Sequence, residues 1–211
     1  DQFLPLPEPL DSLYKNIHAL YVDNDYLWIS TFSMGLHRYH LKSEELIRYI
    51  HTDSPSSISQ NSVFALCKDR TDKLWVGTLS GLDLYDYSTE TFKRNEHLQT
   101  GAIYDIYEDN DGEIWVSTFS NGLFRYIRSN NEWKNYRYNA LDNESISYNT
   151  VTSIFEDKFH QIWITTQGGG FCRFNKEDET FYRYNSTHGL PNDVVHQIQE
   201  DDNGDFWLST N

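Results

Sequence analysis

Residues 113–126 read EIWVSTFSNGLFRY, which is two short runs of β-branched and aromatic residues around a turn that contains Asn and Gly. Such runs, bounded by Gly, Asn or Ser, are typical of a β-hairpin. Close relatives of this stretch occur elsewhere in the chain. The sequence is therefore best understood as a set of repeats.

Five of the six tryptophans mark these repeats. They are separated by 47, 40, 48 and 44 residues. A period of this length is typical of a solenoid, an array or a propeller. The phrases LWISTF, LWVGTL, IWVSTF, IWITTQ and FWLSTN carry Trp28, Trp75, Trp115, Trp163 and Trp207.

Four short apolar runs make up each full repeat. In the third repeat these are GAIYDIYE, then IWVST after the acidic turn EDNDGE, then GLFRYIR, and last EWKNYRY. Runs of four to eight residues between turn signals predict strands. Helices are disfavoured, because no ten-residue window keeps apolar residues at helical spacing without Gly, Pro or an Asn-Asp cluster. Each repeat therefore predicts a four-stranded antiparallel meander.

The second strand of a repeat is apolar on both faces, as Leu27, Trp28 and Ile29 illustrate. A single four-stranded sheet cannot bury both faces, so neighbouring sheets must cover them. Sheets stacked around an axis do this. We therefore predict an all-β chain that forms a β-propeller fragment of four full blades and half a blade. It spans residues 1–211, with blades at about 16–50, 61–95, 101–138 and 149–185 and the half blade at 192–211.

Charge and composition exclude several classes of function. The formal charge of −15 repels nucleic acid phosphates and anionic lipid head groups, and no basic patch offsets it. No apolar stretch is long enough to span a membrane, and the first residues lack the pattern of a signal peptide. We expect a trimmed soluble segment that does not bind nucleic acid.

The repeat resembles a known family. Residues 149–170 follow the pattern N-x-V-x-x-I-x-E-D-x-x-x-x-I-W-I-x-T-x-x-G-G, which is similar to the two-component regulator propeller repeat. The linkers TDSPSSISQNSV, LDNESISYNTV and HGLPNDVV resemble the approaches to that repeat. The resemblance covers about residues 16–210.

This resemblance implies the periplasmic sensor region of a hybrid two-component system, of the kind typical of gut Bacteroidetes. Such a region is coupled through a membrane helix to a histidine kinase, and it responds to glycans. The parent protein would be membrane-anchored, whereas this chain carries no kinase motif and no catalysis of its own. Family propellers usually close with more blades. We therefore expect open strand edges at residues 198–210 and near the N-terminus, which a second copy could pair with to form a homodimer.

Metal, cofactor and catalytic patterns are not recognisable in the sequence. DNDG at 109–112 and DDNG at 201–204 resemble the start of a calcium loop, but a strand follows at once, so a turn is the favoured interpretation. The eight histidines form no repeated ligand motif, and no Gly-x-Ser-x-Gly elbow occurs. Cys67 and Cys172 are expected to be buried thiols and not a disulfide.

One end of the predicted blades is the candidate ligand-binding face. The loop between strands two and three lies at the same end as the link from strand four to the next blade, and such loops are common binding sites. The links are residues 53–61 and 142–149. Rings beside Ser, Asn and Gln suit a sugar, whereas the scarcity of Lys and Arg disfavours a sulfated or uronic ligand. The candidate loop residues are Phe32, Ser33, Met34, Leu79, Ser80, Phe119, Ser120, Asn121, Gln167 and Gly168.

We therefore expect a periplasmic sensing and interaction module that binds an oligosaccharide or another small ligand, or other propeller blades. Two alternatives stay open. The chain could belong to a propeller enzyme, such as a lyase or a glycosidase, with its catalytic residues around the central channel. It could also be a structural spacer, in which case the candidate loops are ordinary solvated turns.

Overall fold

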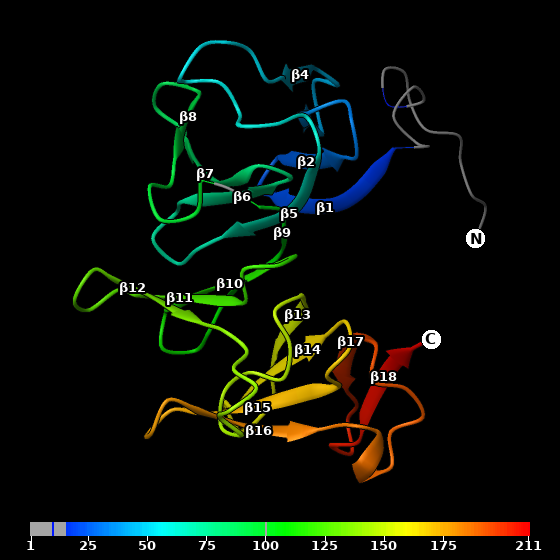
Figure 1. Ribbon diagram of the computed structural model, residues 1–211. Coiled ribbons are helices and arrows are strands. Elements are labelled where there is room, and N and C mark those ends of the chain that lie inside the picture. The colour runs from blue at the N-terminus through cyan, green and yellow to red at the C-terminus, as the bar shows by residue number, and fades with distance from the viewer. Residues whose placement is uncertain (1–9, 11–15, 100) are drawn as a thin grey trace, which may run out of the picture. The chain divides into compact units, whose positions relative to one another are not determined.

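The computed structural model describes Leu10, residues 16–99 and residues 101–211. Apart from short 3-10 turns such as η2, Ser186–His188, the regular structure in these residues is β-strand. The strands form four antiparallel four-stranded sheets and one two-stranded sheet, and strands next to each other in sequence are neighbours in every sheet (Figure 1). The prediction of an all-β chain with four full sheets and one half sheet is confirmed.

The chain divides into two compact units, Asp1–Thr100 and Gly101–Asn211. The first unit contains two four-stranded sheets. Their strands are β1 Ile17–Asp23, β2 Tyr26–Thr31, β3 Leu36–His40, β4 Leu46–Tyr49, β5 Val63–Lys68, β6 Leu74–Thr78, β7 Gly81–Asp86 and β8 Thr91–Arg94.

The second unit contains two four-stranded sheets and the two-stranded sheet. Their strands are β9 Ile103–Glu108, β10 Ile114–Thr118, β11 Leu123–Ile127, β12 Glu132–Tyr136, β13 Val151–Glu156, β14 Ile162–Thr166, β15 Phe171–Asn175, β16 Thr180–Tyr184, β17 Val195–Glu200 and β18 Phe206–Thr210.

Within each unit, the first strands of successive sheets lie side by side. Strand β1 contacts β5 in the first unit, and β13 contacts both β9 and β17 in the second. The other strands of each sheet follow outward in sequence order. This is the arrangement of propeller blades, in which the first strand is the innermost.

Tryptophans of the second strands fill the space between sheets. Trp28 is fully buried between the two sheets of the first unit, and Trp115 is equally buried between the first two sheets of the second unit. Trp163 is half-buried, whereas the side chain of Trp207 on β18 is 69% exposed. The repeated tryptophans therefore share a position in sequence but not an environment.

Each innermost strand carries a β-bulge at its second residue. The pairing of β5 with β6 shifts between Val63 and Ala65, and the other four innermost strands shift at the same place. A bulge leaves one residue outside the regular ladder and redirects its side chain. The residues at the five bulges are His18, Phe64, Tyr104, Thr152 and His196.

Candidate functional site

A threonine at the end of each second strand fixes the loop that follows. In the first sheet the hydroxyl of Thr31 donates to the carbonyl of Gly35 at 2.7 Å and accepts from the backbone N–H of Met34 at 2.9 Å. Both bonds recur in the other full sheets, so these loops are held in one conformation. The equivalent threonines are Thr78, Thr118 and Thr166.

The residue after each threonine bonds to the residue just before the innermost strand of its own sheet. The N–H of Phe32 donates to the carbonyl of Asn16 at 2.9 Å, and the N–H of Phe119 donates to the carbonyl of Ala102 at 3.0 Å. Leu79 and Gln167 make the same bond. The sequence prediction that these loop residues gather at one end of the sheets therefore agrees with the geometry.

The side chains of these loop residues meet the side chains at the bulges. The rings of Phe32 and Phe64 are 5.9 Å apart, and those of Tyr104 and Phe119 are 5.8 Å apart. We use the term loop rim for the bulge residues together with the residues after the threonines. In the first unit the loop rim is His18, Phe32, Phe64 and Leu79, and in the second unit it is Tyr104, Phe119, Thr152, Gln167, His196 and Asn211.

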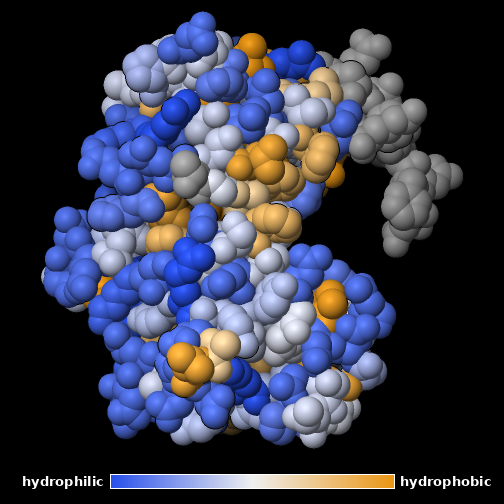
Figure 2. Space-filling view, in the orientation of Figure 1, coloured by the Kyte–Doolittle hydropathy of each residue, from blue (hydrophilic) through white to orange (hydrophobic). Residues whose placement is uncertain are grey.

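Several apolar groups of the loop rim are exposed. Phe32 is 59% exposed, Leu79 is 47% exposed and Phe119 is 48% exposed, although each follows a buried strand. Figure 2 shows an apolar patch on the first unit, near the place where Figure 1 draws β1 and β5, in a view that is otherwise mainly hydrophilic. Exposed rings held on rigid loops are suited to binding.

The remaining predicted site residues divide into two groups. Ser33, Ser120 and Gly168 are exposed beside the loop rim. Met34, Ser80 and Asn121 are half-buried. Met34 packs against the cluster of Ile29 and Tyr39, and the backbone carbonyl of Asn121 accepts from Asn135 Nδ2 at 2.9 Å. These two residues are therefore better placed to support the loops than to contact a ligand.

An asparagine side chain bonds to the start of each predicted link to the next blade. Asn61 Oδ1 accepts from the N–H of His51 at 2.7 Å, and Asn149 Oδ1 accepts from the N–H of Tyr138 at 2.8 Å. The carbonyls of the same two asparagines accept from Gly35 and Gly122, which connects each link to the loop after a second strand. The asparagine of the N-x-V pattern is thus a structural residue.

The bulge residues are not among the candidate site residues predicted from the sequence. A signal for them exists in the sequence. In each innermost strand, two apolar residues are three sequence positions apart, whereas a regular strand face repeats every two. Val63 and Leu66 are one such pair, and Val151 and Ile154 are another. Since strand faces alternate with a period of two, a spacing of three indicates an inserted residue.

The carboxylate of Asp105, next to the bulge residue Tyr104, bonds to backbone groups. Burial raises the pKa of Asp105 to about 6, although its carboxylate accepts from the N–H groups of Ile154 and Ile106, each at 2.9 Å. Burial also raises the pKa of the Tyr104 hydroxyl. Within the described ranges, no group of three or more His, Cys, Asp or Glu side chains could hold a metal ion.

The acidic turns use their carboxylates for structure. Asp109 accepts from the indole N–H of Trp115 and from the N–H of Glu113, both at 2.8 Å. Asp201 makes the equivalent bonds to Trp207 and Asp205, both at 3.0 Å. These contacts support the turn interpretation of both segments.

Two further predictions concern the cysteines and the membrane. Cys172 is buried as predicted, but Cys67 is only half-buried because it lies near the end of an innermost strand, and no disulfide joins the two. Among the described residues, the model contains no helix with the length and apolar character needed to cross a bilayer.

Comparison with known proteins identifies the repeat. The family model described as two component regulator propeller matches residues 57–80, 97–120, 145–168 and 189–211. A protein described as histidine kinase P4, from Formosa agariphila, is 33% identical over 132 residues. That match covers 58% of this chain and 9% of the relative, so the chain spans less than a tenth of the relative's length.

Solved structures with the same fold include two from B. thetaiotaomicron. The extracellular domain assigned to a one component system has a TM-score of 0.73, and the one assigned to a hybrid two component system has a TM-score of 0.68. Both are 20% identical and cover 92% of this chain, which covers 26% and 32% of them. The virginiamycin B lyase of Staphylococcus aureus, 15% identical over 92% of this chain and 62% of the lyase, has a TM-score of 0.66. These similarities confirm the propeller fold.

Proposed function

Since this chain carries repeats of the two-component regulator propeller family, we propose that it is part of the periplasmic, ligand-sensing region of a membrane-anchored histidine kinase. The 33% identity to a stretch of a histidine kinase supports this assignment. The extracellular domains that share its fold support a location outside the cytoplasm. In such a protein the chain contributes recognition, and other segments contribute the phosphotransfer.

The observation that carries the proposal is the loop rim. Each unit carries its own part of the loop rim, with the exposed ring of Phe32 in the first and of Phe119 in the second. Each ring follows a threonine whose two hydrogen bonds, together with one backbone bond, fix the loop in advance. A ligand that meets a pre-formed site loses less free energy to ordering the protein. Aromatic faces next to hydroxyl and amide groups, such as those of Ser33, Ser120 and Gln167, suit the apolar faces and hydroxyls of a neutral oligosaccharide.

A thermal-shift screen with neutral oligosaccharides tests the proposal. Ligand bound to the native state raises stability by about 2.7 kcal/mol at a concentration one hundred times its Kd. We expect at least one neutral oligosaccharide to raise the melting temperature of the parent chain. The double variant Phe32→Ala, Phe119→Ala is expected to lose that rise while melting near the parent temperature without ligand, because both side chains are exposed.

The matched control is Phe159→Ala. Phe159 is 77% exposed and lies in the turn between β13 and β14, at the opposite ends of the strands from the loop rim. We expect this variant to keep the ligand-induced rise. A parent chain that no neutral oligosaccharide stabilises would favour the spacer interpretation. An equal loss in Phe159→Ala would show that the loop rim is not the site.

A further inference from the structure

The link between the two full sheets of the second unit carries an exposed aromatic ring that the loop rim does not include. Tyr148 lies in this link and is 43% exposed. Its neighbours are anchored, because the hydroxyl of Ser147 lies 3.2 Å from Thr166 Oγ1 and the carbonyl of Asn149 accepts from the N–H of Gly122 at 2.9 Å. The ring of Tyr148 is therefore held on a link that is fixed on either side of it.

The loop after β14 is shaped to fit this link. It reads QGGG at 167–170, whereas the corresponding loop after β10 reads FSNG. A Cβ atom at Gly169 would lie 2.6 Å from the carbonyl oxygen of Ser147, and one at Gly168 would lie 3.5 Å from Tyr148 Cζ. The two additional glycines therefore let the backbone of this loop approach the link closely, with Gly168 against the ring of Tyr148.

One residue of the link joins this loop to the loop after β10. The carbonyl of Thr150 accepts from the N–H of Gln167 at 2.9 Å, and the hydroxyl of Thr150 donates to the carbonyl of Phe119. Phe119 thus belongs to the loop on one side of the link, whereas the ring of Tyr148 lies against the loop on the other side. Two exposed rings are therefore carried by two loops that one link holds together.

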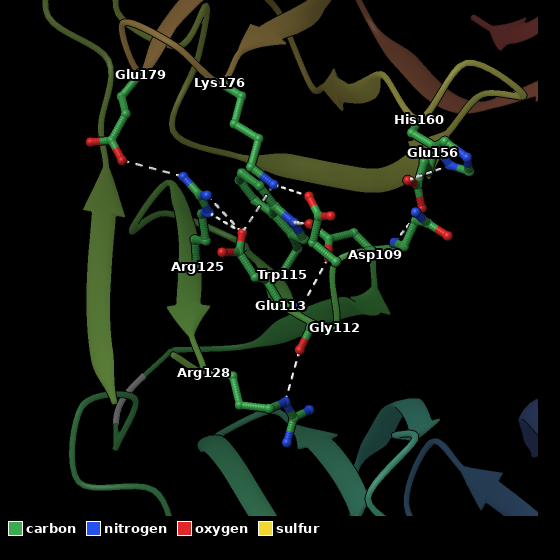
Figure 3. A network of polar contacts seen from close by, with 12 residues as sticks. Asp109, Gly112, Glu113, Trp115, Arg125, Arg128, Glu156, His160, Lys176 and Glu179 are labelled. Atoms are coloured by element: carbon green, nitrogen blue, oxygen red, sulfur yellow. Dashed lines mark hydrogen bonds and ion pairs between the residues drawn. The ribbon is translucent and has the colours of Figure 1, made fainter. Parts of the chain in front are cut away.

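Ion pairs fix the two sheets that carry these loops. Arg125 and Lys134 of the β9–β12 sheet both reach Glu179 of the β13–β16 sheet, at 3.3 Å and 2.6 Å. Lys176 of the β13–β16 sheet pairs with Asp111 of the other sheet. Figure 3 shows Glu179 and Lys176 pointing toward Arg125 and its neighbours. A ligand that bridges the two loops therefore loses little free energy to ordering the protein.

Polar groups lie next to both rings. Within the described ranges, neither the hydroxyl of Tyr148 nor the side-chain amide of Gln167 has a hydrogen-bond partner in the protein. Ser120 follows Phe119 and is exposed as well. Aromatic faces suit the apolar faces of sugar rings, and free hydroxyl and amide groups suit their hydroxyls. Each of the two loops therefore offers the chemistry that one sugar unit requires.

We propose that the second unit binds a linear neutral oligosaccharide across the link, with one sugar unit on Phe119 and another on Tyr148. This inference rests on the proposed function, and it assigns Tyr148 as a further residue that contacts the ligand. In the first unit Gln60 takes the place of Tyr148, one residue before Asn61 as Tyr148 is before Asn149. The side-chain carbonyl of Gln60 accepts from the N–H of Asn61 at 2.7 Å, so the second unit is the one that suits two stacked sugars.

Thermal-shift titrations of the whole chain with sugars of increasing length test this inference. The probes are glucose, cellobiose and cellotriose, then glucose, maltose and maltotriose, and last xylose, xylobiose and xylotriose. In at least one series, we expect the trisaccharide to bind at least about tenfold more tightly than the monosaccharide, because a second sugar gains its own ring. Equal affinity within every series that binds would overturn this inference and leave the proposed function standing. No stabilisation by any of these sugars would count against both.

Variants of the tyrosine test the assigned residue. Tyr148→Ala is expected to bind the trisaccharide at least about tenfold more weakly than the parent does, whereas Tyr148→Phe keeps the ring and is expected to keep the length preference. Tyr182→Ala is the matched control, because Tyr182 is 52% exposed but lies on β16, the outermost strand of the same sheet. We expect this variant to bind as the parent does. Unchanged trisaccharide affinity in Tyr148→Ala would overturn the assignment.

Two single variants locate the site even if Tyr148→Ala fails to fold. Phe119→Ala is expected to weaken trisaccharide binding at least about tenfold, whereas Phe32→Ala, in the first unit, is expected to bind as the parent does. Both side chains are exposed, so little effect on folding is expected. Loss of binding in Phe32→Ala, or unchanged binding in Phe119→Ala, would overturn the placement of the ligand on the second unit.

Discussion

An aspartate and a tryptophan six residues apart form the recurring contact of this chain. Asp69, Asp109, Asp157 and Asp201 each accept from the indole N–H of the following tryptophan, at 2.8 to 3.0 Å. The first repeat lacks this contact. Its turn is one residue shorter, the indole nitrogen of Trp28 finds no partner among the described residues, and its aspartate pairs with Lys68 and Tyr87. In the first repeat, contacts to the neighbouring sheet therefore replace the contact to the tryptophan.

The different burial of the tryptophans predicts that their alanine variants differ in stability. Trp115→Ala removes a fully buried ring that packs between two sheets, and it is expected to lower the free energy of unfolding by about 3–5 kcal/mol. Trp207→Ala removes a ring that is 69% exposed, and the expected loss is below about 1 kcal/mol. Urea unfolding followed by circular dichroism measures both. Equal losses of unfolding free energy in the two variants would contradict the burial of Trp115 and the exposure of Trp207.

The burial of Asp83 predicts that the stability of the chain depends on pH. Burial raises the pKa of this carboxyl group to about 6; Oδ2 accepts from the N–H of Ser59 at 2.7 Å, and Oδ1 has no partner within the described ranges. The folded state therefore holds a proton that the unfolded state has released. Its stabilising contribution is complete below about pH 4, declines as the pH rises through 6, and stays low above that.

The Asp83→Asn variant isolates this effect. The free energy of unfolding of the parent minus that of the variant should fall by about 2 kcal/mol between pH 4 and pH 7, because each pKa unit is worth about 1.4 kcal/mol and part of the change lies below pH 4. Chemical denaturation at several pH values measures the difference. A difference that is constant with pH, or one that rises, would contradict the buried, partnerless oxygen.

At the scale of elements, the loops after the second strands are as regular as the strands. The glycine that ends each loop has a positive φ, and a Cβ atom at that position would meet a backbone carbonyl of the fourth strand or of the link that follows it. At Gly122 the φ angle is +79° and the carbonyl of Tyr136 would be 2.1 Å away. Glycine is needed at this position for both reasons.

Substitution of that glycine tests the loop. Gly122→Ala is expected to cost more than about 3 kcal/mol, because a strained φ and a backbone clash act together. Gly189 is the matched control, with a φ of +100° and no atom within 4 Å of the added Cβ. Gly189→Ala is expected to cost only about 1–2 kcal/mol. Thermal melts compare the two, and equal costs would exclude the clash.

The elements also show what the sequence could predict. Strand positions, the turns and the end at which the loop residues gather followed from apolar runs and turn residues, because these depend on local chemistry. The bulges are not evident from any single run, because they follow only from the spacing of three that all five innermost strands share. The contacts between the turns of neighbouring sheets could not be predicted, since they depend on which side chain, Tyr87 or Lys176, reaches the turn of a neighbouring sheet.

At the scale of the whole molecule, the two units repeat one pattern of contacts. In the first unit Arg38 reaches Glu90 of the next sheet at 2.5 Å, and in the second unit Arg125 reaches Glu179 of the next sheet at 3.3 Å. Both arginines also lie over the buried tryptophan of their own sheet. The two units therefore share the contacts that join neighbouring sheets.

The central claim is that the loop rim recognises the ligand of a sensor. The most direct measurement is an NMR titration of the parent chain with the neutral oligosaccharide that stabilises it most. We expect saturable shifts at the loop-rim residues of a unit, either at Phe32 and its neighbours or at Phe119, Gln167 and their neighbours, and little change elsewhere. Shifts confined to other parts of the chain, or no saturable shifts with any neutral oligosaccharide, would contradict it.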